Sequence, residues 1–165
     1  MAKTQTALFA GGCFWGVEAA FRQIPGVVRT TVGYTGGQRE NPSYEQVSTG
    51  ATGHAEAIEV EFDPTRITYP ELLDHFWQMH DPTQLDRQGP DVGRQYRSAI
   101  FYTGNEQKQQ AEASKNDLAK SGRFDKPIVT EVIAATPFYP AEDYHQRFFE
   151  KQGRAQSTPE LQEMS

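Results

Sequence analysis

One stretch near the N-terminus decides the fold of this 165-residue chain: Phe9-Ala10-Gly11-Gly12-Cys13-Phe14-Trp15-Gly16. Residues 6–9 indicate a short strand that leads into it, and its two adjacent glycines indicate a tight turn. From Cys13 onward, apolar residues recur at helical spacing, at Phe14, Val17, Phe21 and Ile24. The only cysteine of the protein therefore stands where a strand turns into a helix.

The position of Cys13 predicts an activated thiol. The first backbone N–H groups of a helix have no intrahelical partner, and the helix dipole places partial positive charge there. We therefore expect a lowered pKa and a nucleophile near neutral pH. The glycines before it leave room for a substrate and adopt backbone angles that other residues avoid. The alternative is an inert, buried thiol that fills space.

Trp15 falls on the opposite side of the predicted helix from the apolar stripe, together with Glu18 and Arg22. A tryptophan outside the core stripe of its own helix needs another apolar partner. One candidate partner is a ligand, because Trp15 lies two residues from the thiol.

The length and composition of the chain indicate a single domain, and we expect a catalytic domain over 1–152 with a polar, flexible tail over 153–165. The net charge of -6 argues against nucleic-acid binding, and no apolar run is long enough for a membrane span or a signal peptide. We expect a cytoplasmic location. A single cysteine excludes an intramolecular disulfide, and four histidines with one cysteine argue against a structural zinc site.

Residues 54–62 form the clearest strand pattern in the sequence, with strict alternation of two faces. Glu56 lies on the apolar face, which it shares with His54, Ile58, Val60 and Phe62. Burial of a carboxyl raises its pKa and favours the protonated form. Glu56 is therefore a candidate proton donor, unless the strand frays at this end and the side chain reaches water.

The remaining segments predict a mixture of strands and helices. In chain order they are a strand over 27–34, a helix that opens with a capping box at 68–71, a polar loop over 83–97, a strand over 98–102, a helix over about 103–121, a strand over 128–135, and a last helix over 141–152 with Tyr144, Phe148 and Phe149 inward. A loop as long as 83–97 is often functional. The alternation of elements favours an α+β sandwich with a mixed sheet.

These residues support two chemistries. A thiolate that attacks a carbonyl needs a paired histidine, for which His54 and His145 are candidates, and an oxyanion hole. A thiolate that attacks an oxygen-bearing heteroatom needs proton donors instead, for which Glu56, Tyr44 and Tyr96 are candidates. Pattern and composition alone leave both open.

Several motifs, in order along the chain, resemble the peptide methionine sulfoxide reductase A family. They are Gly11-Gly12-Cys13-Phe14-Trp15-Gly16, Gly33-Tyr34-Thr35-Gly36-Gly37, Asn41-Pro42-Ser43-Tyr44, Gly53-His54-Ala55-Glu56, His80-Asp81-Pro82-Thr83, Gly89-Pro90-Asp91-Val92-Gly93-Arg94-Gln95-Tyr96-Arg97-Ser98 and Phe138-Tyr139-Pro140-Ala141-Glu142-Asp143-Tyr144-His145-Gln146. The resemblance spans about residues 7–150 and implies a ferredoxin-like α+β sandwich.

The resemblance also implies a role for each candidate site residue. The Cys13 thiolate attacks the sulfur of a methionine S-sulfoxide, Glu56 protonates its oxygen, and methionine leaves while Cys13 becomes a sulfenic acid. The other implied roles are hydrogen bonds to the oxygen from Tyr44 and Tyr96, orientation of substrate or water by Asp91, an S-methyl pocket made by Phe14 and Trp15, and contacts around the substrate from Gly12 and His54, with His54 a structural hydrogen-bonding group rather than a catalyst. Tyr144 and His145 are expected to brace the fold.

The chain departs from many relatives because it has no second cysteine, and Ser48 stands where some relatives have one. The sulfenic acid must therefore be reduced by an external thiol: glutathione with glutaredoxin, thioredoxin, or a small dithiol. We expect a monomer with no bound cofactor and no metal. Two alternatives are a cysteine hydrolase or acyltransferase that uses Cys13, His54 and Glu56, and a non-catalytic thiol redox sensor.

Overall fold

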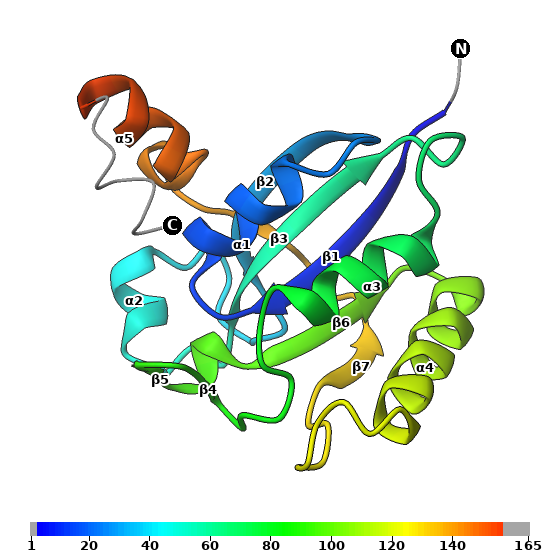
Figure 1. Ribbon diagram of the computed structural model, residues 1–165. Helices are drawn as coiled ribbons and strands as arrows, with labels where there is room; N and C mark the ends of the chain where they lie inside the picture. Colours follow the sequence, from blue (N-terminus) through cyan, green and yellow to red (C-terminus); the bar gives the residue numbers. More distant parts are fainter. Residues whose placement is uncertain (1–2, 157–165) are drawn as a thin grey trace.

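A mixed sheet of six strands forms the centre of the molecule (Figure 1). The computed structural model describes residues 3–156, with side chains as far as residue 152. The strands are β1 (Gln5–Gly11), β2 (Val27–Thr35), β3 (Ala55–Phe62), β6 (Ser98–Tyr102), β7 (Glu131–Ala134) and β8 (Tyr139–Pro140). Their spatial order is β7-β6-β1-β3-β2-β8, and only β6 and β7 run parallel.

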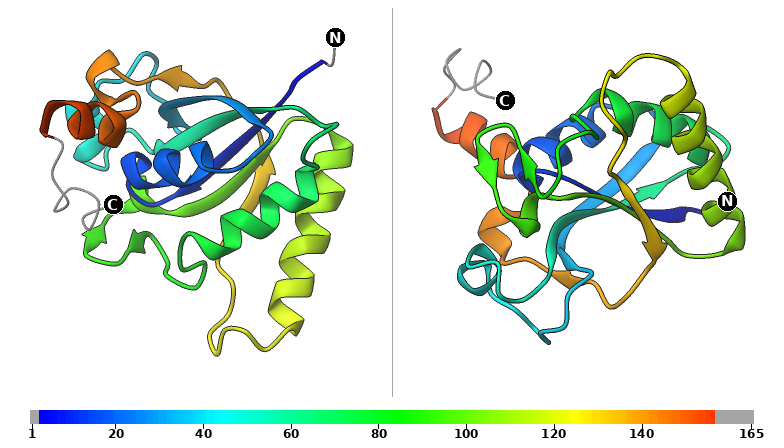
Figure 2. Two further views of the ribbon diagram at one scale, coloured as in Figure 1. Left: turned by 45° about the horizontal axis from the view of Figure 1, so that its top comes forward. Right: turned by 90° about the horizontal axis from the view of Figure 1, so that it is seen from below.

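Three helices lie against one face of this sheet: α1 (Phe14–Arg22), α3 (Tyr69–Gln78) and α4 (Asn105–Lys120) (Figure 2). The smaller elements are α2 (Tyr44–Ser48), α5 (Phe148–Gln156), the hairpin of β4 (Arg87–Gln88) and β5 (Asp91–Val92), and two 3-10 helices, η1 (Arg94–Tyr96) and η2 (Asp143–His145). Within residues 3–156, no helix is long and apolar enough to cross a membrane.

The order of the four central strands is that of two split βαβ units. β3 lies between β1 and β2, which α1 connects, and β1 lies between β3 and β6, which α3 connects. This arrangement is the ferredoxin-like core. The prediction of an α+β sandwich with a mixed sheet is confirmed.

The main core lies between the sheet and the helices, and Phe9 of β1 is at its centre. Its ring packs against Phe21 of α1 at 5.0 Å and Phe76 of α3 at 4.9 Å. β3 alternates as its sequence predicts: Ile58, Val60 and Phe62 belong to this core, whereas its alanines face a smaller cluster on the other side of the sheet. Because β3 keeps this register to its start, Glu56 points toward the helix layer.

Two segments differ from the sequence-based expectation. The polar loop over 83–97 contains the β4–β5 hairpin and η1. The strand predicted over 128–135 begins only at Glu131, because the residues before it bond elsewhere: Val129 N–H donates to Pro82 O, and Lys115 Nζ donates to Thr130 O.

The predicted last helix, 141–152, is also wrong in its first half. The Gln146 side chain bonds to both backbone groups of Val32 on β2, and Arg147 turns with a φ of 52°, so η2 and α5 are separate. Tyr144 is 58% exposed rather than inward. Helix α5 continues to Gln156, beyond the expected domain end at 152, and residues 157–165 lie outside the described part.

Candidate active site

Cys13 is the N-cap residue of α1 and follows Gly12, whose φ is 107°. A Cβ on Gly12 would lie 2.8 Å from Cγ of Gln88 on β4, which is closer than atoms pack. The Gln88 side chain is itself fixed, because it bonds to the backbone N–H and carbonyl of Asp81. Gly12 therefore allows the β4–β5 hairpin, which carries Asp91, to lie against the turn at Cys13.

Glu56 is only 1% exposed and lies beside the first turn of α1. Its Oε1 accepts a hydrogen bond of 3.1 Å from the Phe14 backbone N–H, and its Oε2 has no hydrogen-bond partner among the described residues. Burial raises the pKa of Glu56 to about 8; the bond from Phe14 opposes this rise and the charge of Asp91 adds to it. Glu56 is a protonated carboxyl at neutral pH, and the alternative of a frayed strand end is wrong.

Cys13 differs from the expectation. Burial, together with the charges of Glu56 and Asp91, raises the pKa of Cys13 to about 11. The backbone N–H groups of Trp15 and Gly16 lower the pKa, as a helix N-terminus should, but they do not offset the loss of water. The prediction of a lowered pKa is therefore wrong for the free protein, because a partly buried site between two carboxyl groups disfavours a thiolate.

Tyr44 and Tyr96 come from separate elements that are tied together. Tyr44 opens α2, where its N–H donates to Oε2 of Glu142, and Tyr96 ends η1. The Gln95 amide on η1 donates to the Ser48 carbonyl at the end of α2. Burial raises the pKa of both tyrosines, with the charge of Glu56 as the next cause, so both stay protonated donors.

In their ionised forms Cys13 and Glu56 raise the pKa of both tyrosines, and the charge of Asp91 raises the pKa of Cys13, Glu56 and Tyr96. The fold thus gathers four polar candidates around Cys13: Glu56, Tyr44, Tyr96 and Asp91.

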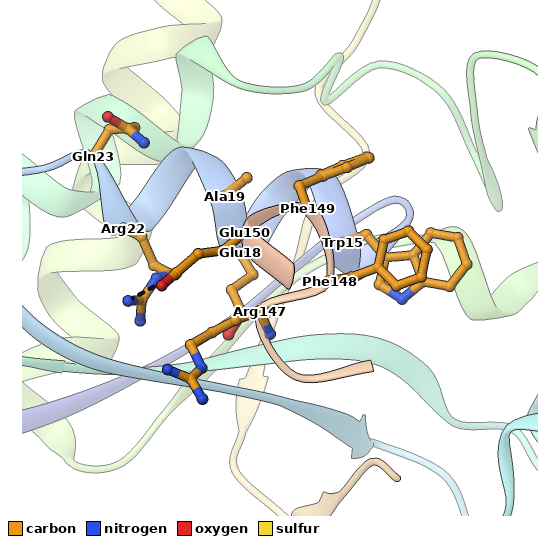
Figure 3. Close-up of a pocket in the computed structure, with 9 residues that line it drawn as sticks. All are labelled: Trp15, Glu18, Ala19, Arg22, Gln23, Arg147, Phe148, Phe149 and Glu150. Atoms are coloured by element: carbon orange, nitrogen blue, oxygen red, sulfur yellow. Dashed lines mark hydrogen bonds and ion pairs between the residues drawn. The ribbon is translucent and has the colours of Figure 1, made fainter. Parts of the chain in front are cut away.

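Phe14 and Trp15 supply the apolar part of this region. Phe14 is 1% exposed and packs against the rings of Tyr44 and His145, at 6.4 and 5.2 Å. Trp15 is half-buried; its indole N–H donates to His145 Nδ1 at 2.9 Å, and its ring stacks on Phe148 of α5 at 3.8 Å (Figure 3). Trp15 also lines a groove of about 390 Å³ between α1 and α5.

Glu18 is buried, although it lies on the side of α1 opposite the apolar stripe. It is 1% exposed, and its carboxylate accepts hydrogen bonds from Thr30 Oγ1 at 2.8 Å and from the Arg147 N–H at 2.6 Å. The chain after residue 140 folds back over this side of α1, which the sequence of the helix alone does not reveal.

His54 has the structural hydrogen bonds that the sequence analysis expected of it. Its Nδ1 accepts the Gly37 N–H at 3.0 Å, and its Nε2 donates to the Arg39 carbonyl at 2.6 Å. Both nitrogens are occupied by backbone groups, so His54 braces the loop after β2. His54 is therefore not free to act as the base that the cysteine hydrolase alternative needs. The other candidate base, His145, already accepts a hydrogen bond from Trp15 at its Nδ1.

The sequence reasoning gave the 138–146 motif only a bracing role, whereas the structure brings two of its residues to the site. His145 touches Phe14, Trp15 and Tyr44. Glu142 holds the start of α2 and also accepts the Tyr34 hydroxyl at 2.8 Å. The polar residues of that motif could have indicated a functional role, but no local sequence pattern shows which element they pack against.

Comparison with known proteins gives consistent matches. Residues 5–164 match the family described as peptide methionine sulfoxide reductase. The peptide methionine sulfoxide reductase MsrA of Methanosarcina mazei is 61% identical over 153 residues, which are 93% of this chain and 72% of that protein.

Solved structures agree. Methionine sulfoxide reductase A of Corynebacterium diphtheriae is similar with a TM-score of 0.81 and 41% identity, over 92% of this chain and 76% of that one. Mxr1 from Saccharomyces cerevisiae, in a structure of its complex with Trx2, is similar with a TM-score of 0.64 and 26% identity, over 87% of this chain and 84% of that one.

Proposed function

Because the chain belongs to the peptide methionine sulfoxide reductase family and reduces methionine sulfoxide in peptides and proteins, we propose that Cys13 attacks the sulfoxide sulfur while Glu56 protonates its oxygen. The observation that carries this assignment is the buried Glu56 carboxyl, which is protonated at neutral pH and has one oxygen with no hydrogen-bond partner within residues 3–156. A sulfoxide oxygen accepts hydrogen bonds, and the protonated Glu56 carboxyl can donate one through its O–H group.

The proposed reaction starts with both groups protonated. Glu56 transfers its proton to the sulfoxide oxygen as Cys13 Sγ attacks the sulfur, and the resulting carboxylate accepts the thiol proton. The hydroxyl then transfers to Cys13: the S–O bond breaks as an Sγ–O bond forms, and the bond between Sγ and the methionine sulfur breaks, which leaves a sulfenic acid on Cys13 and releases the thioether as methionine. Sulfur of methionine is reduced by two electrons and sulfur of Cys13 is oxidised by two.

The neighbouring groups orient the substrate in this proposal. The Tyr44 and Tyr96 hydroxyls donate hydrogen bonds to the oxygen, while Asp91 orients the substrate or a nearby water. Phe14 and Trp15 hold the S-methyl group against apolar surface, and Gly12 lets the β4–β5 hairpin, which carries Asp91, lie against the turn at Cys13. Since oxygen and methyl group then have fixed places on a chiral sulfur, the site accepts one epimer, and the family resemblance implies that this is the S epimer.

The reductant in this proposal is an external thiol. With one cysteine in the chain, two thiol equivalents from outside must convert the sulfenic acid to a thiol and water. A relative, Mxr1, is seen in complex with Trx2, which favours a reductant protein of the thioredoxin type; glutathione with glutaredoxin and a small dithiol supply the same chemistry.

We also propose that the protein acts as a monomer in the cytoplasm. One chain carries every group that the mechanism uses, so no second copy is needed. A catalytic thiol without a disulfide partner also suits a compartment that keeps thiols reduced.

A single turnover without reductant tests the reaction, with each epimer of methionine sulfoxide offered separately. The proposal predicts one methionine released per protein from the S epimer only, and one oxygen atom added to Cys13 in the intact mass. Cys13→Ser releases none. Methionine released by that variant contradicts the role of Cys13, and no methionine from folded, reduced wild-type protein contradicts the reaction.

A further inference from the structure

Helix α2, which carries Tyr44, has only five residues and depends on contacts with other elements, because a helix this short has little stability of its own. Its start is fixed by the Tyr44 N–H, which donates to Oε2 of Glu142 at 2.9 Å. Val47 of this helix is fully buried in the main core. Apolar packing has no preferred direction, so it does not stop the helix from pivoting about that start. A polar contact at the other end of α2 would stop it.

Gln95 supplies that contact from η1. Its Nε2 donates to the carbonyl of Ser48, the last residue of α2, at 3.2 Å. The η1 segment is itself fixed, because the Arg97 guanidinium donates to the carbonyl of Arg94 at 3.0 Å and to Oε1 of Glu131 on β7 at 3.0 Å. Gln95 therefore ties the end of α2 to a part of the chain that β7 anchors.

The Gln95 side chain is 6% exposed and lies in a space that a glycine leaves for it. A Cβ on Gly93, the residue before η1, would overlap the atoms of the amide. Oε1 of Gln95 has no hydrogen-bond partner within residues 3–156. A buried amide with an unsatisfied oxygen is unfavourable for stability alone, because an apolar side chain of similar length would fill the space without a polar group to desolvate. Stability alone therefore does not account for a glutamine at this position.

We propose that Gln95 is a positioning residue, which stops α2 from pivoting and thereby keeps the Tyr44 hydroxyl directed at the sulfoxide oxygen. The inference rests on the proposed function, in which Tyr44 donates a hydrogen bond to that oxygen. Tyr96 follows Gln95 in η1 and stays where Arg97 holds this segment. Loss of the Gln95 amide therefore displaces Tyr44 and leaves Tyr96 in place.

Gln95→Met tests this inference, because it keeps the length of the side chain but cannot donate to Ser48. In single turnovers at subsaturating S-sulfoxide, we expect the rate of methionine release to fall about tenfold, because a misplaced donor stabilises the transition state less. The backbone amides of Val47 and Thr49, which donate within and just after α2, should exchange with solvent about tenfold faster in this variant.

Gln107→Met is the matched control. The Gln107 amide likewise donates to a backbone carbonyl, that of Thr6 at 2.9 Å, but this bond joins α4 to the start of β1, whereas Cys13 follows the end of β1. The control should leave both the rate of methionine release and the amide exchange of α2 at their wild-type values.

Two double-mutant cycles identify the group through which Gln95 acts. In a Tyr44→Phe background, Gln95→Met should lower the rate by less than about twofold, because the hydroxyl that it directs is absent. In a Tyr96→Phe background, Gln95→Met should keep most of its effect on the rate. A general loss of structure would lower the rate by the same factor in both backgrounds, and that result would show the inference to be wrong.

The outcomes separate this inference from the proposed function. If the wild type releases no methionine from the S epimer, the proposed function fails and the inference about Tyr44 fails with it. If the wild type is active but Gln95→Met matches it in rate and in amide exchange, the inference alone is wrong.

A measurement on the wild type needs no variant to fold. The hydrogen-bonded proton of the Gln95 side-chain amide should exchange with water at least about tenfold more slowly than the amide protons of Gln109, which is exposed on α4. Equal exchange at the two side chains would contradict the inference.

Discussion

At the scale of the residue, burial is what makes Glu56 an acid. The carboxyl occupies a position on β3 where Ile58, Val60 and Phe62 are fully buried, and its only described hydrogen bond comes from the Phe14 N–H. Its pKa of about 8 means that the folded protein holds a proton that the unfolded chain releases from about pH 4.5 upward. The same burial that supplies the proton donor therefore destabilises the fold at neutral pH.

This linkage predicts a pH dependence of stability. The folded pKa of Glu56 is raised, so its contribution falls as pH rises from about 4.5 to about 8 and is then constant. Between pH 5 and pH 8 the wild type should lose about 3 kcal/mol more unfolding free energy than Glu56→Gln, whose amide resembles the protonated acid. Denaturant titrations of both proteins at pH 5 and pH 8 measure this difference in unfolding free energy. Equal losses of unfolding free energy in the two proteins would contradict the raised pKa of Glu56.

At the scale of the element, the β4–β5 hairpin reaches the site only because the residue after β1, Gly12, is a glycine. Gly12 combines a φ of 107° with the close approach of Gln88, and the sequence predicted the turn but not the hairpin that packs on it. The hairpin residues lie in a polar stretch without alternation or periodicity, so nothing local distinguishes them from a loop. The conformation of the hairpin is held by tertiary contacts, such as the hydrogen bonds between the Gln88 side chain and the backbone of Asp81.

Gly12→Ala separates this packing from backbone strain. The variant should lose on the order of 2 kcal/mol of stability or more and most of its activity, because the methyl group displaces Gln88. Gly89→Ala is the control: Gly89 lies in the same hairpin with a φ of 58°, but a Cβ there meets nothing within 4 Å. It should lose about 1 kcal/mol and keep its activity. Equal activity losses in the two variants would show that contact with Gln88 is irrelevant.

At the scale of the whole molecule, the sequence predicted the sheet and the helix layer well, and the C-terminal part poorly. Periodicity places apolar residues of each element correctly, because burial of those residues is what forms the two layers. It does not show that 142–148 returns to β2 and α1, because polar groups carry that return: Glu142 and Gln146 bond to residues of β2, and Glu18 of α1 accepts the Arg147 N–H. The prediction of a lowered pKa for Cys13 was wrong for a similar reason, because the carboxyl groups that lie near the thiol come from distant segments of the chain.

The contact of the C-terminal segment with α1 gives a stability prediction. Glu18→Ala leaves the Arg147 N–H and the Thr30 hydroxyl without their acceptor and should destabilise the protein by about 2–3 kcal/mol. Glu150→Ala removes the ion pair with Arg22 on the surface of the same contact, at 3.1 Å, and should change stability by less than about 1 kcal/mol. Thermal melts compare the two, and a larger effect for Glu150 would contradict this ranking.

The central claim is that a protonated Glu56 gives its proton to the sulfoxide oxygen, and the pH dependence of a single turnover tests it most directly. At subsaturating S-sulfoxide, the wild-type rate of methionine release should be constant up to about pH 8 and then fall about tenfold per pH unit, because the free enzyme loses the Glu56 proton there. Glu56→Gln should be slower by about 10²–10⁴-fold and show no fall near pH 8. A wild-type rate that keeps rising through pH 8, or a Glu56→Gln rate equal to that of the wild type, would contradict the account.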